Sequence, residues 1–348
     1  MVKFRPGKVL AGATALMMAV MGACASEEPG VASEPGSAED QVLTVYSGRE
    51  EELVADLLAQ FESDTGIELD VRYGDSAELA ATILEEGESS PADLFFSQDA
   101  GSLGAVAGEG LFQELDAEVL ERVDDRFRSP DGLWVGTSGR ARVAAYNTDL
   151  VEEGDLPGSI VDFTDPEWKG RIGFPPTNSS FQAFVAAMIE LEGENATRDF
   201  LEGLSANDPK LYEDNSATVR GIAAEEVEVG FVNHYYIYEV AAEDGDIPVA
   251  NHFFTGGDPG ALVNAAGVGV LASTEAPEAA QEFVDYLTGE EGQAYFSEDT
   301  YEYPVTPDLE PSVELVPLDE IDSPDVDLSN LGATIEPALE LLAEVGLL

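Results

Sequence analysis

The amino-acid sequence predicts an α/β fold of two lobes, each a sheet covered by helices, joined by a two-strand hinge. Strand-like and helix-like segments alternate from residue 42 onward, a pattern that predicts parallel strands with helices on both faces. The chain has 348 residues, 44% of them hydrophobic, which is enough for two domains with a sizeable core. No internal repeat of about 20 to 50 residues is present, so a solenoid or propeller is not expected.

The first expected elements follow a strand–helix order. Leu53, Leu57 and Phe61 recur at helical spacing and end before Gly66. Asp75 and Glu78 have the spacing of a capping box at a helix start. The expected strands are 42–46, 67–73 and 91–96, and the expected helices are 50–65, 75–86 and one after Asp99.

The remaining elements keep the same α/β character. Residues 134–147 are expected to form two strands on either side of Gly139. Further strands are expected at 171–174, 229–232 and 267–271, and helices from Ser180, Thr197 and Ser216, at 276–287 and from about Ser329.

The chain is expected to cross between the lobes twice. Lobe 1 is predicted at 42–141 with 266–317 returning to it, and lobe 2 at 142–265 with the C-terminal helix, 318–348, packed on it. Ligands of α/β sheets bind at the carboxyl ends of strands and at helix N-termini. We therefore expect the ligand site in a cleft between the lobes.

The N-terminus is typical of a secretion signal. Lys3, Arg5 and Lys8 precede an apolar run of 12 residues, 9–20, which suits a signal-peptide core but is too short to span a bilayer. Small residues then lead to Cys24, the only cysteine. We predict a signal peptide at 1–23, lipidation of Cys24 and a flexible tether at 24–41; an incidental thiol is the alternative. The pattern resembles a bacterial lipobox, with Met21 at the position usually held by Leu.

The charge balance is strongly acidic. The chain has 15 basic and 71 acidic residues. Three basic residues lie in the predicted signal peptide, so the mature chain would carry 12 − 71 = −59. Such a surface repels nucleic acid, which excludes that class of partner. Acids spread along the whole chain suit concentrated salt, which screens their mutual repulsion.

The residues for catalysis are scarce. The chain has two histidines, and it has neither a nucleophile-elbow or phosphate-loop motif nor a cysteine cluster for zinc. We therefore expect no enzyme. Asp325, Asp327, Ser329 and Glu336 have the spacing of a calcium loop, but Asn330 replaces its glycine, so helix capping by Asp327 or Ser329 is the preferred interpretation.

The sequence from Val232 to Tyr238 is the most informative segment. It carries Tyr235 and Tyr236 side by side after an expected strand, with Asn233 and His234 before them. Aromatic runs commonly pack in cores, and that alternative stays open. Phenolate oxygen is, however, a hard anionic donor that suits a trivalent cation such as Fe(III). Binding would displace two phenol protons.

The sequence from residue 42 to 348 resembles the ferric-binding proteins of bacterial ABC importers, which have the type II periplasmic-binding-protein fold. The resemblance rests on the order and spacing of short motifs: Thr44-Val-Tyr-Ser-Gly48, Phe61-Glu-x-x-Thr-Gly-Ile67, Pro91-Ala-Asp-Leu-Phe-Phe96, Ser138-Gly-Arg-x-Arg-Val143, Trp168-Lys-Gly170, Asn233-x-Tyr-Tyr236, Asp258-Pro-Gly-Ala-Leu262 and Phe283-Val-Asp285.

The resemblance implies that Tyr235 and Tyr236 hold Fe(III). Glu50 stands where such proteins often have a ligand histidine, and Gln98 where some have a glutamate. The two departures compensate in charge, because Glu50 and two phenolates sum to −3 and balance Fe³⁺. We expect Glu50 to be a ligand and Gln98 to be at most a donor to the ligands.

A carbonate or phosphate anion is implied as well. Its expected site is the helix start at Asn178, Ser179 and Ser180, with further contacts from Asn215, Asn233 and Arg140. Salt bridging is an equal alternative for Arg140 and Arg142, and Arg49 is expected in a surface ion pair with Glu50.

The expected protein is a monomer anchored by lipid to the outer face of the cytoplasmic membrane, or periplasmic, and its partner is an ABC permease. The alternatives are the same fold with another metal, an oxyanion, a polyamine or thiamine, a metal-dependent hydrolase, or a surface lipoprotein without a small ligand.

Overall fold

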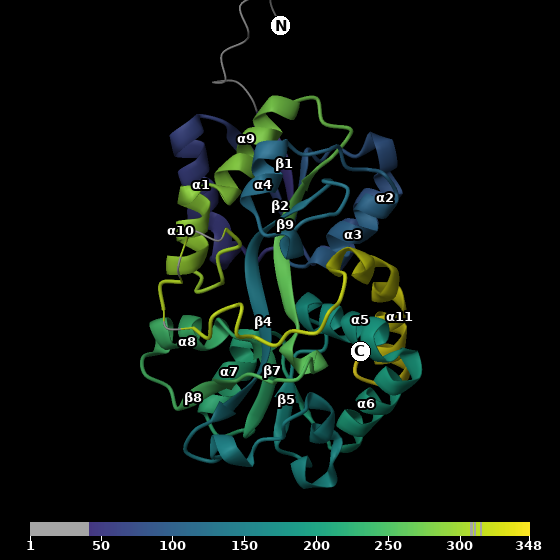
Figure 1. Cartoon of the computed structure of the whole chain (residues 1–348), viewed down its shortest axis with the longest axis vertical. Coiled ribbons are helices and arrows are strands. Elements are labelled where there is room, and N and C mark those ends of the chain that lie inside the picture. Colours follow the sequence, from purple (N-terminus) through teal and green to yellow (C-terminus); the bar gives the residue numbers. More distant parts are fainter. Residues whose placement is uncertain (1–41, 307–308, 310, 314) are drawn as a thin grey trace, which may run out of the picture. The chain divides into compact units, whose positions relative to one another are not determined.

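Residues 42–306, 309, 311–313 and 315–348 are described by the structure, a computed structural model (Figure 1). The predicted signal peptide, Cys24 and the predicted tether lie outside these residues. Within the described part, a mixed sheet has the strand order β2-β1-β3-β9-β4-β7-β5-β6, and β8 pairs with β4.

The first three strands are parallel, as the alternation of elements predicts. β1 (Val42–Ser47) lies between β2 (Glu68–Tyr73) and β3 (Leu94–Ser97). The connecting helices are α1 (Glu51–Thr65), α2 (Ser76–Glu86) and α3 (Ala100–Gly108). Gly66 ends α1 in the left-handed conformation, and Asp75 caps α2 by accepting from the backbone N–H of Ala77 at 2.9 Å.

Two long antiparallel strands link the two halves of the sheet (Figure 1). β4 (Val135–Asn147) pairs with β9 (Val263–Val270) through Ala141 and with β7 from Arg142. The expectation of two strands around Gly139 is wrong, because β4 is continuous. Gly139 also bridges to Tyr303, and a Cβ at this position would lie 3.2 Å from the Cβ of Tyr303. Close approach of another segment explains this glycine.

The second half of the sheet carries the remaining strands: β5 (Ile172–Phe174), β6 (Lys210–Leu211), β7 (Val229–Asn233) and β8 (Val249–His252). The accompanying helices are α5 (Ser179–Glu192), α6 (Glu194–Ala206), α7 (Asn215–Ala223) and α8 (Tyr236–Asp244). Phe163, Phe174, Phe181 and Phe231 pack ring to ring between these elements.

The sequence after β9 returns to the first half of the sheet. α9 (Pro277–Thr288) packs on β9, α10 (Glu290–Glu298) packs on α9 and β4, and α4 (Ala117–Arg122) packs on α9. The C-terminal helix, α11 (Gly332–Glu344), packs against α5 and α6 and also against α3 (Figure 1). It therefore touches helices that accompany both halves of the sheet.

The fold is the expected α/β sheet with covering helices, and the lobe boundaries stay a prediction. Asp327 caps a short 3-10 turn (Leu328–Leu331) before α11, which confirms its interpretation as a cap. In the described part of the chain, no helix is both long and apolar enough to cross a membrane.

Candidate functional site

The turn between β7 and α8 positions the tyrosine pair. β7 is buried along its whole length, and α8 begins directly after it. Tyr235 adopts the right-handed helical conformation at the N-cap of α8, and Tyr236 is the first helical residue. Both side chains are 0% exposed, and their ring centroids lie 4.2 Å apart with the planes inclined by 30°. The expected convergence of neighbouring phenols is present.

The phenol oxygens of Tyr235 and Tyr236 are buried, and neither has a hydrogen-bond partner outside the pair among the described residues. Burial raises the pKa of Tyr235 to about 12, although the positive charge of the nearby Arg140 lowers it. Burial, with the phenol of Tyr235 and the carboxyl of Glu50, raises the pKa of Tyr236 well above its usual value. An unsatisfied buried polar group costs about 1–3 kcal/mol. Two adjacent ones indicate a site for a ligand, whereas a tyrosine that only fills the core normally has its hydroxyl bonded.

Glu50 is a half-buried residue at the start of α1. It stands at the N-cap of α1 and its side chain makes no capping bond there. Burial, followed by the charge of Asp214, raises its pKa, while Arg49 and Arg140 lower it. Its carboxyl in turn raises the pKa of both tyrosines. Glu50 therefore interacts electrostatically with the tyrosine pair, and its role as a ligand stays a prediction.

Gln98 is buried beside these groups. Its side-chain Nε2 has no hydrogen-bond partner among the described residues. Its backbone is fixed, because its N–H donates to Ser76 Oγ at 2.9 Å and its carbonyl accepts from Arg140 at 2.6 Å. A free amide donor here suits contact with a ligand oxygen.

The basic side chains of the pocket divide into two kinds. Arg49 and Arg140 both bind the buried carboxylate of Glu302, at 2.8 and 2.7 Å. Burial alone would raise the pKa of Glu302, but the two guanidinium groups outweigh it and hold that pKa at about 2. The expectation of a surface ion pair for Arg49 is wrong, since its side chain is buried and Glu302, about 250 residues later in the sequence, is its partner.

Arg142 is buried without an acidic partner among the described residues. It donates to the carbonyl oxygens of Ser180 and Phe231 and lies over the rings of Phe181 and Phe184. Burial lowers its pKa to about 10, while the phenols of the tyrosine pair raise it. The salt-bridge alternative therefore holds for Arg140 and fails for Arg142.

Several polar groups of the expected anion site form hydrogen bonds with one another. Asn178 caps α5, and its Oδ1 accepts from the N–H and the hydroxyl of Ser180, at 3.0 and 2.6 Å, and from Asn215 at 3.2 Å. Asn233 Nδ2 is buried and unpartnered in the described structure, and so is Asn215 Oδ1. Asn233, at the end of β7, thus has a free donor for an anion. Both terminal nitrogens of Arg140 are occupied, while its Nε is buried and has no partner among the described residues.

Ser179 faces a carboxylate. Burial raises the pKa of Asp75, and hydrogen bonds from the backbone of Ala77 and Glu78 and from the Ser179 hydroxyl lower it. Ser179 thus interacts with the carboxyl of Asp75.

His234, which precedes the tyrosine pair, is bound to backbone groups. The ring of His234 accepts from Ala141 N–H at 3.1 Å and lies 3.2 Å from the Tyr301 carbonyl, and burial lowers its pKa to about 4. In the described residues, no three side chains of the types His, Cys, Asp and Glu gather as they would around a metal. A metal in this pocket would have to use the phenols.

Buried, unpartnered polar groups near the ends of the strands of an α/β sheet are typical of a protein that binds a small ligand. The chain belongs to the family of bacterial extracellular solute-binding proteins, which residues 89–320 match.

The relatives are named for ferric iron. The chain is 35% identical over 312 residues to the Fe(3+)-binding periplasmic protein of Serratia marcescens, covering 89% of this chain and 91% of that one. It is 31% identical to the major ferric iron-binding protein of Neisseria meningitidis, over 88% of this chain and 93% of that one. Iron-bound HitA of Pseudomonas aeruginosa has the same fold, with a TM-score of 0.83 and 36% identity over 88% of this chain and 99% of HitA.

Two acidic residues of the pocket escape the sequence analysis. Glu302 lies far along the sequence from both of its partners, so no local pattern marks it. Glu239 follows Tyr235 by four residues and Tyr236 by three. That spacing puts it on the same face of a helix and is a signal that the sequence does contain.

Proposed function

We propose that this protein captures Fe(III) between Tyr235, Tyr236 and Glu50 and delivers it to an ABC permease, without turnover. The observation on which the proposal depends is the pair of buried, unpartnered phenol oxygens. The names of the relatives support the same cargo.

The donor set suits a hard trivalent ion better than a divalent one. Two phenolates and one carboxylate are oxygen ligands with a combined charge of −3, which balances Fe³⁺. The raised pKa values of both phenols mean that they are protonated in the empty site at neutral pH. Iron must therefore displace two protons, and its affinity should increase with pH.

We further propose a synergistic anion, carbonate or phosphate, at the start of α5. Ser179 would supply its backbone N–H, the start of α5 its helix dipole, and Asn233 its free Nδ2. The N–H groups of Asn178 and Ser180 donate within the protein, to the carbonyl of Pro175 and to Asn178 Oδ1. Asn215 orders the loop through its bond to Asn178. Asp75 next to Ser179 favours a singly charged anion, because like charges repel.

The remaining parts of the proposal concern partners and place. The mature chain would be anchored through lipidated Cys24 to the outer face of the cytoplasmic membrane and would present the loaded form, as a monomer, to the permease. Lobe closure around the ion is the conformational change by which a permease would recognise loading. Gln98 would contact a ligand oxygen through its free Nε2.

The test is a visible spectrum. Ferric citrate added to purified protein should give a tyrosinate-to-iron absorption band that the double variant Tyr235→Phe, Tyr236→Phe lacks. Tyr286→Phe is the matched control, because its hydroxyl bonds Asp64 in another part of the molecule and its loss should leave the band unchanged. A wild-type protein without the band refutes iron as cargo and leaves the other ligands of the fold open.

A further inference from the structure

A second carboxylate faces the tyrosine pair. Glu239 lies in the first turn of α8, and its backbone N–H bonds the carbonyl of Tyr235 at 3.1 Å. Side chains three and four positions apart on a helix are neighbours. The tyrosine pair and Glu239 therefore share one face at the start of α8.

The two oxygens of Glu239 differ in their surroundings. Oε1 accepts a hydrogen bond from the Ser216 hydroxyl, on α7, at 3.0 Å. Oε2 is buried and has no hydrogen-bond partner among the described residues. A carboxylate with a structural role alone normally has both oxygens bonded when it is buried. The geometry leaves one oriented oxygen available to a ligand.

Glu239 is also coupled to the other proposed ligands. Its carboxyl raises the pKa of Tyr236, after the effects of burial, Tyr235 and Glu50. Burial raises the pKa of Glu239 itself to about 7. The hydrogen bond from Ser216 lowers this pKa, and the charge of Glu50 raises it further. Two phenols and a carboxyl from the start of α8 thus interact electrostatically with a second carboxyl, Glu50, which comes from a distant part of the sequence.

We propose that Glu239 is a fourth protein ligand of the ferric ion and binds it through its unpartnered Oε2. The inference depends on the proposed function, because it concerns the same ion. The pocket would then bind Fe(III) through two phenolates from the β7–α8 turn, Glu50 from the start of α1 and Glu239 from α8.

The charges of the pocket agree with a fourth anionic ligand. Two phenolates and two carboxylates carry −4 against +3 on the ion, and Arg142, which has no acidic partner in the described structure, brings the sum to zero. Without Glu239, Arg142 would be an uncompensated buried charge, which is costly. The triad of Arg49, Glu302 and Arg140 adds +1, which matches one singly charged anion.

The experiment compares Glu239→Gln with wild type in a competition between protein and citrate for Fe(III). Loss of a ligand should lower the affinity by about 10- to 100-fold and shift the absorption band and the electron-paramagnetic-resonance signal of the bound ion. Glu243→Gln is the matched control one turn later in α8, where the exposed Glu243 pairs with Arg220. Its affinity and spectra should equal those of wild type.

The outcomes separate the two proposals. Wild-type affinity and an unchanged spectrum in Glu239→Gln overturn the inference and leave the iron site standing. A wild type without any band refutes the iron site, and the inference with it. If Glu239→Gln fails to fold, Ser216→Ala replaces it, because it frees Oε1 and keeps the carboxylate. A several-fold loss of affinity and a shifted spectrum are then expected, and unchanged binding overturns the inference.

Discussion

At the scale of single residues, the triad of Arg49, Glu302 and Arg140 determines the electrostatics beneath the ligand pocket. All three side chains are buried, and Arg140 also lies over the ring of Tyr235, 5.7 Å from its centroid. The charges of Arg49 and Arg140 oppose the effect of burial on the pKa of Tyr235. The two guanidinium groups therefore lower the free energy needed to deprotonate Tyr235, whereas the carboxylate of Glu302 raises it.

The same triad makes stability depend on pH. The pKa of Glu302 in the folded protein, about 2, lies below its usual value of 4.5, so its stabilising contribution is present above pH 4.5 and is lost as pH falls toward 2. Glu302→Gln should destabilise the protein by about 3 kcal/mol or more at pH 7, because two buried arginines lose their counter-ion. Urea unfolding at several pH values measures this. The difference in the free energy of unfolding between wild type and variant should become smaller as the pH falls from 4.5 to 2. A constant difference would contradict the assignment of this pH dependence to Glu302.

Glu50 is the residue whose ligand role the sequence analysis proposes. Glu50→Ala should weaken iron binding by at least about 10-fold, because the pocket loses one of its anionic oxygens while its arginines remain. Competition with citrate, read from the visible band, measures the loss. Glu51→Ala serves as control, since Glu51 is the next residue, exposed in the first turn of α1. Equal affinities of the two variants would remove Glu50 from the ligand set.

Residue-scale prediction from the sequence has a physical limit. Tyr235 and Tyr236 are adjacent, so their convergence follows from one local turn. Glu302 meets Arg49 and Arg140 only through the tertiary fold, and its partners could not be inferred from spacing. The predicted surface position of Arg49 is wrong for this reason, because the fold gives Arg49 a buried partner, Glu302, in place of its acidic neighbour in the sequence.

At the scale of elements, α11 is held close to α3 by glycines. A Cβ at Gly104 would lie 2.1 Å from the carbonyl oxygen of Ser329, and one at Gly332 would lie 2.5 Å from the backbone nitrogen of Ala105. Backbone atoms cannot move aside as side chains do, so any larger residue must separate the two segments.

Gly104→Ala should therefore destabilise the protein by about 2 kcal/mol, the typical cost of overpacking. Gly108→Ala is the control in the same helix, because nothing lies within 4 Å of its added Cβ. It should be neutral or stabilising by up to about 1 kcal/mol, as expected for alanine in place of glycine in a helix. Chemical unfolding measures both. Equal effects of the two substitutions would show that helix propensity, rather than the α3–α11 contact, decides the outcome.

Helices and strands can be predicted from the sequence where a local pattern of residues determines them. They are harder to predict where they depend on pairing with residues distant in the sequence. The parallel order of β1, β2 and β3 follows from the alternation of strands and helices. The continuity of β4 does not, because Gly139 suggests a break in the sequence while pairing with Ala265 and Tyr303 keeps the strand extended.

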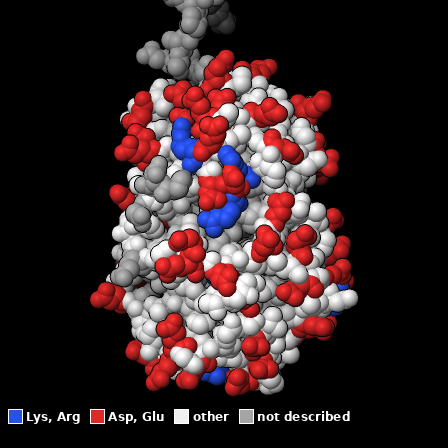
Figure 2. Space-filling view, in the orientation of Figure 1, with Lys and Arg blue, Asp and Glu red and all other residues white. Residues whose placement is uncertain are grey.

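At the scale of the whole molecule, charge is unevenly distributed between surface and pocket. Figure 2 shows acidic side chains spread over the whole visible face, with few basic ones. The mature chain would hold 12 basic residues, and three of them, Arg49, Arg140 and Arg142, are buried at the candidate site. The acidic residues on the surface therefore repel one another, because few basic residues lie among them. The buried arginines supply the positive charge that balances anionic ligands at the candidate site.

This distribution predicts that salt stabilises the protein. The screening length falls from about 10 Å at 0.1 M to about 3 Å at 1 M salt, so repulsion between surface acids weakens. The melting temperature should increase by roughly 5 °C over this range, equivalent to about 2 kcal/mol.

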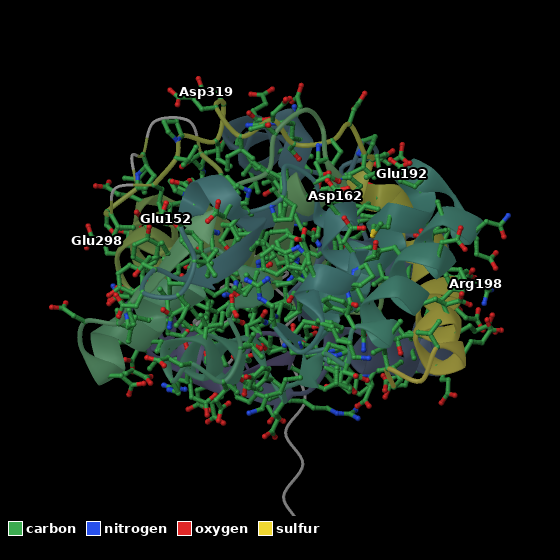
Figure 3. The ribbon with its side chains drawn as sticks, turned by 90° about the horizontal axis from the view of Figure 1, so that it is seen from below. Glu152, Asp162, Glu192, Arg198, Glu298 and Asp319 are labelled. Atoms are coloured by element: carbon green, nitrogen blue, oxygen red, sulfur yellow. The ribbon has the colours of Figure 1, made fainter. Side chains whose placement is uncertain are left out.

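A variant with Glu152→Gln, Glu192→Gln, Glu298→Gln and Asp319→Asn removes four exposed acids that project from the periphery (Figure 3). It should be more stable than wild type at 0.1 M sodium chloride and gain less from added salt. Equal gains in both proteins would mean that salt acts through apolar burial instead of through charge.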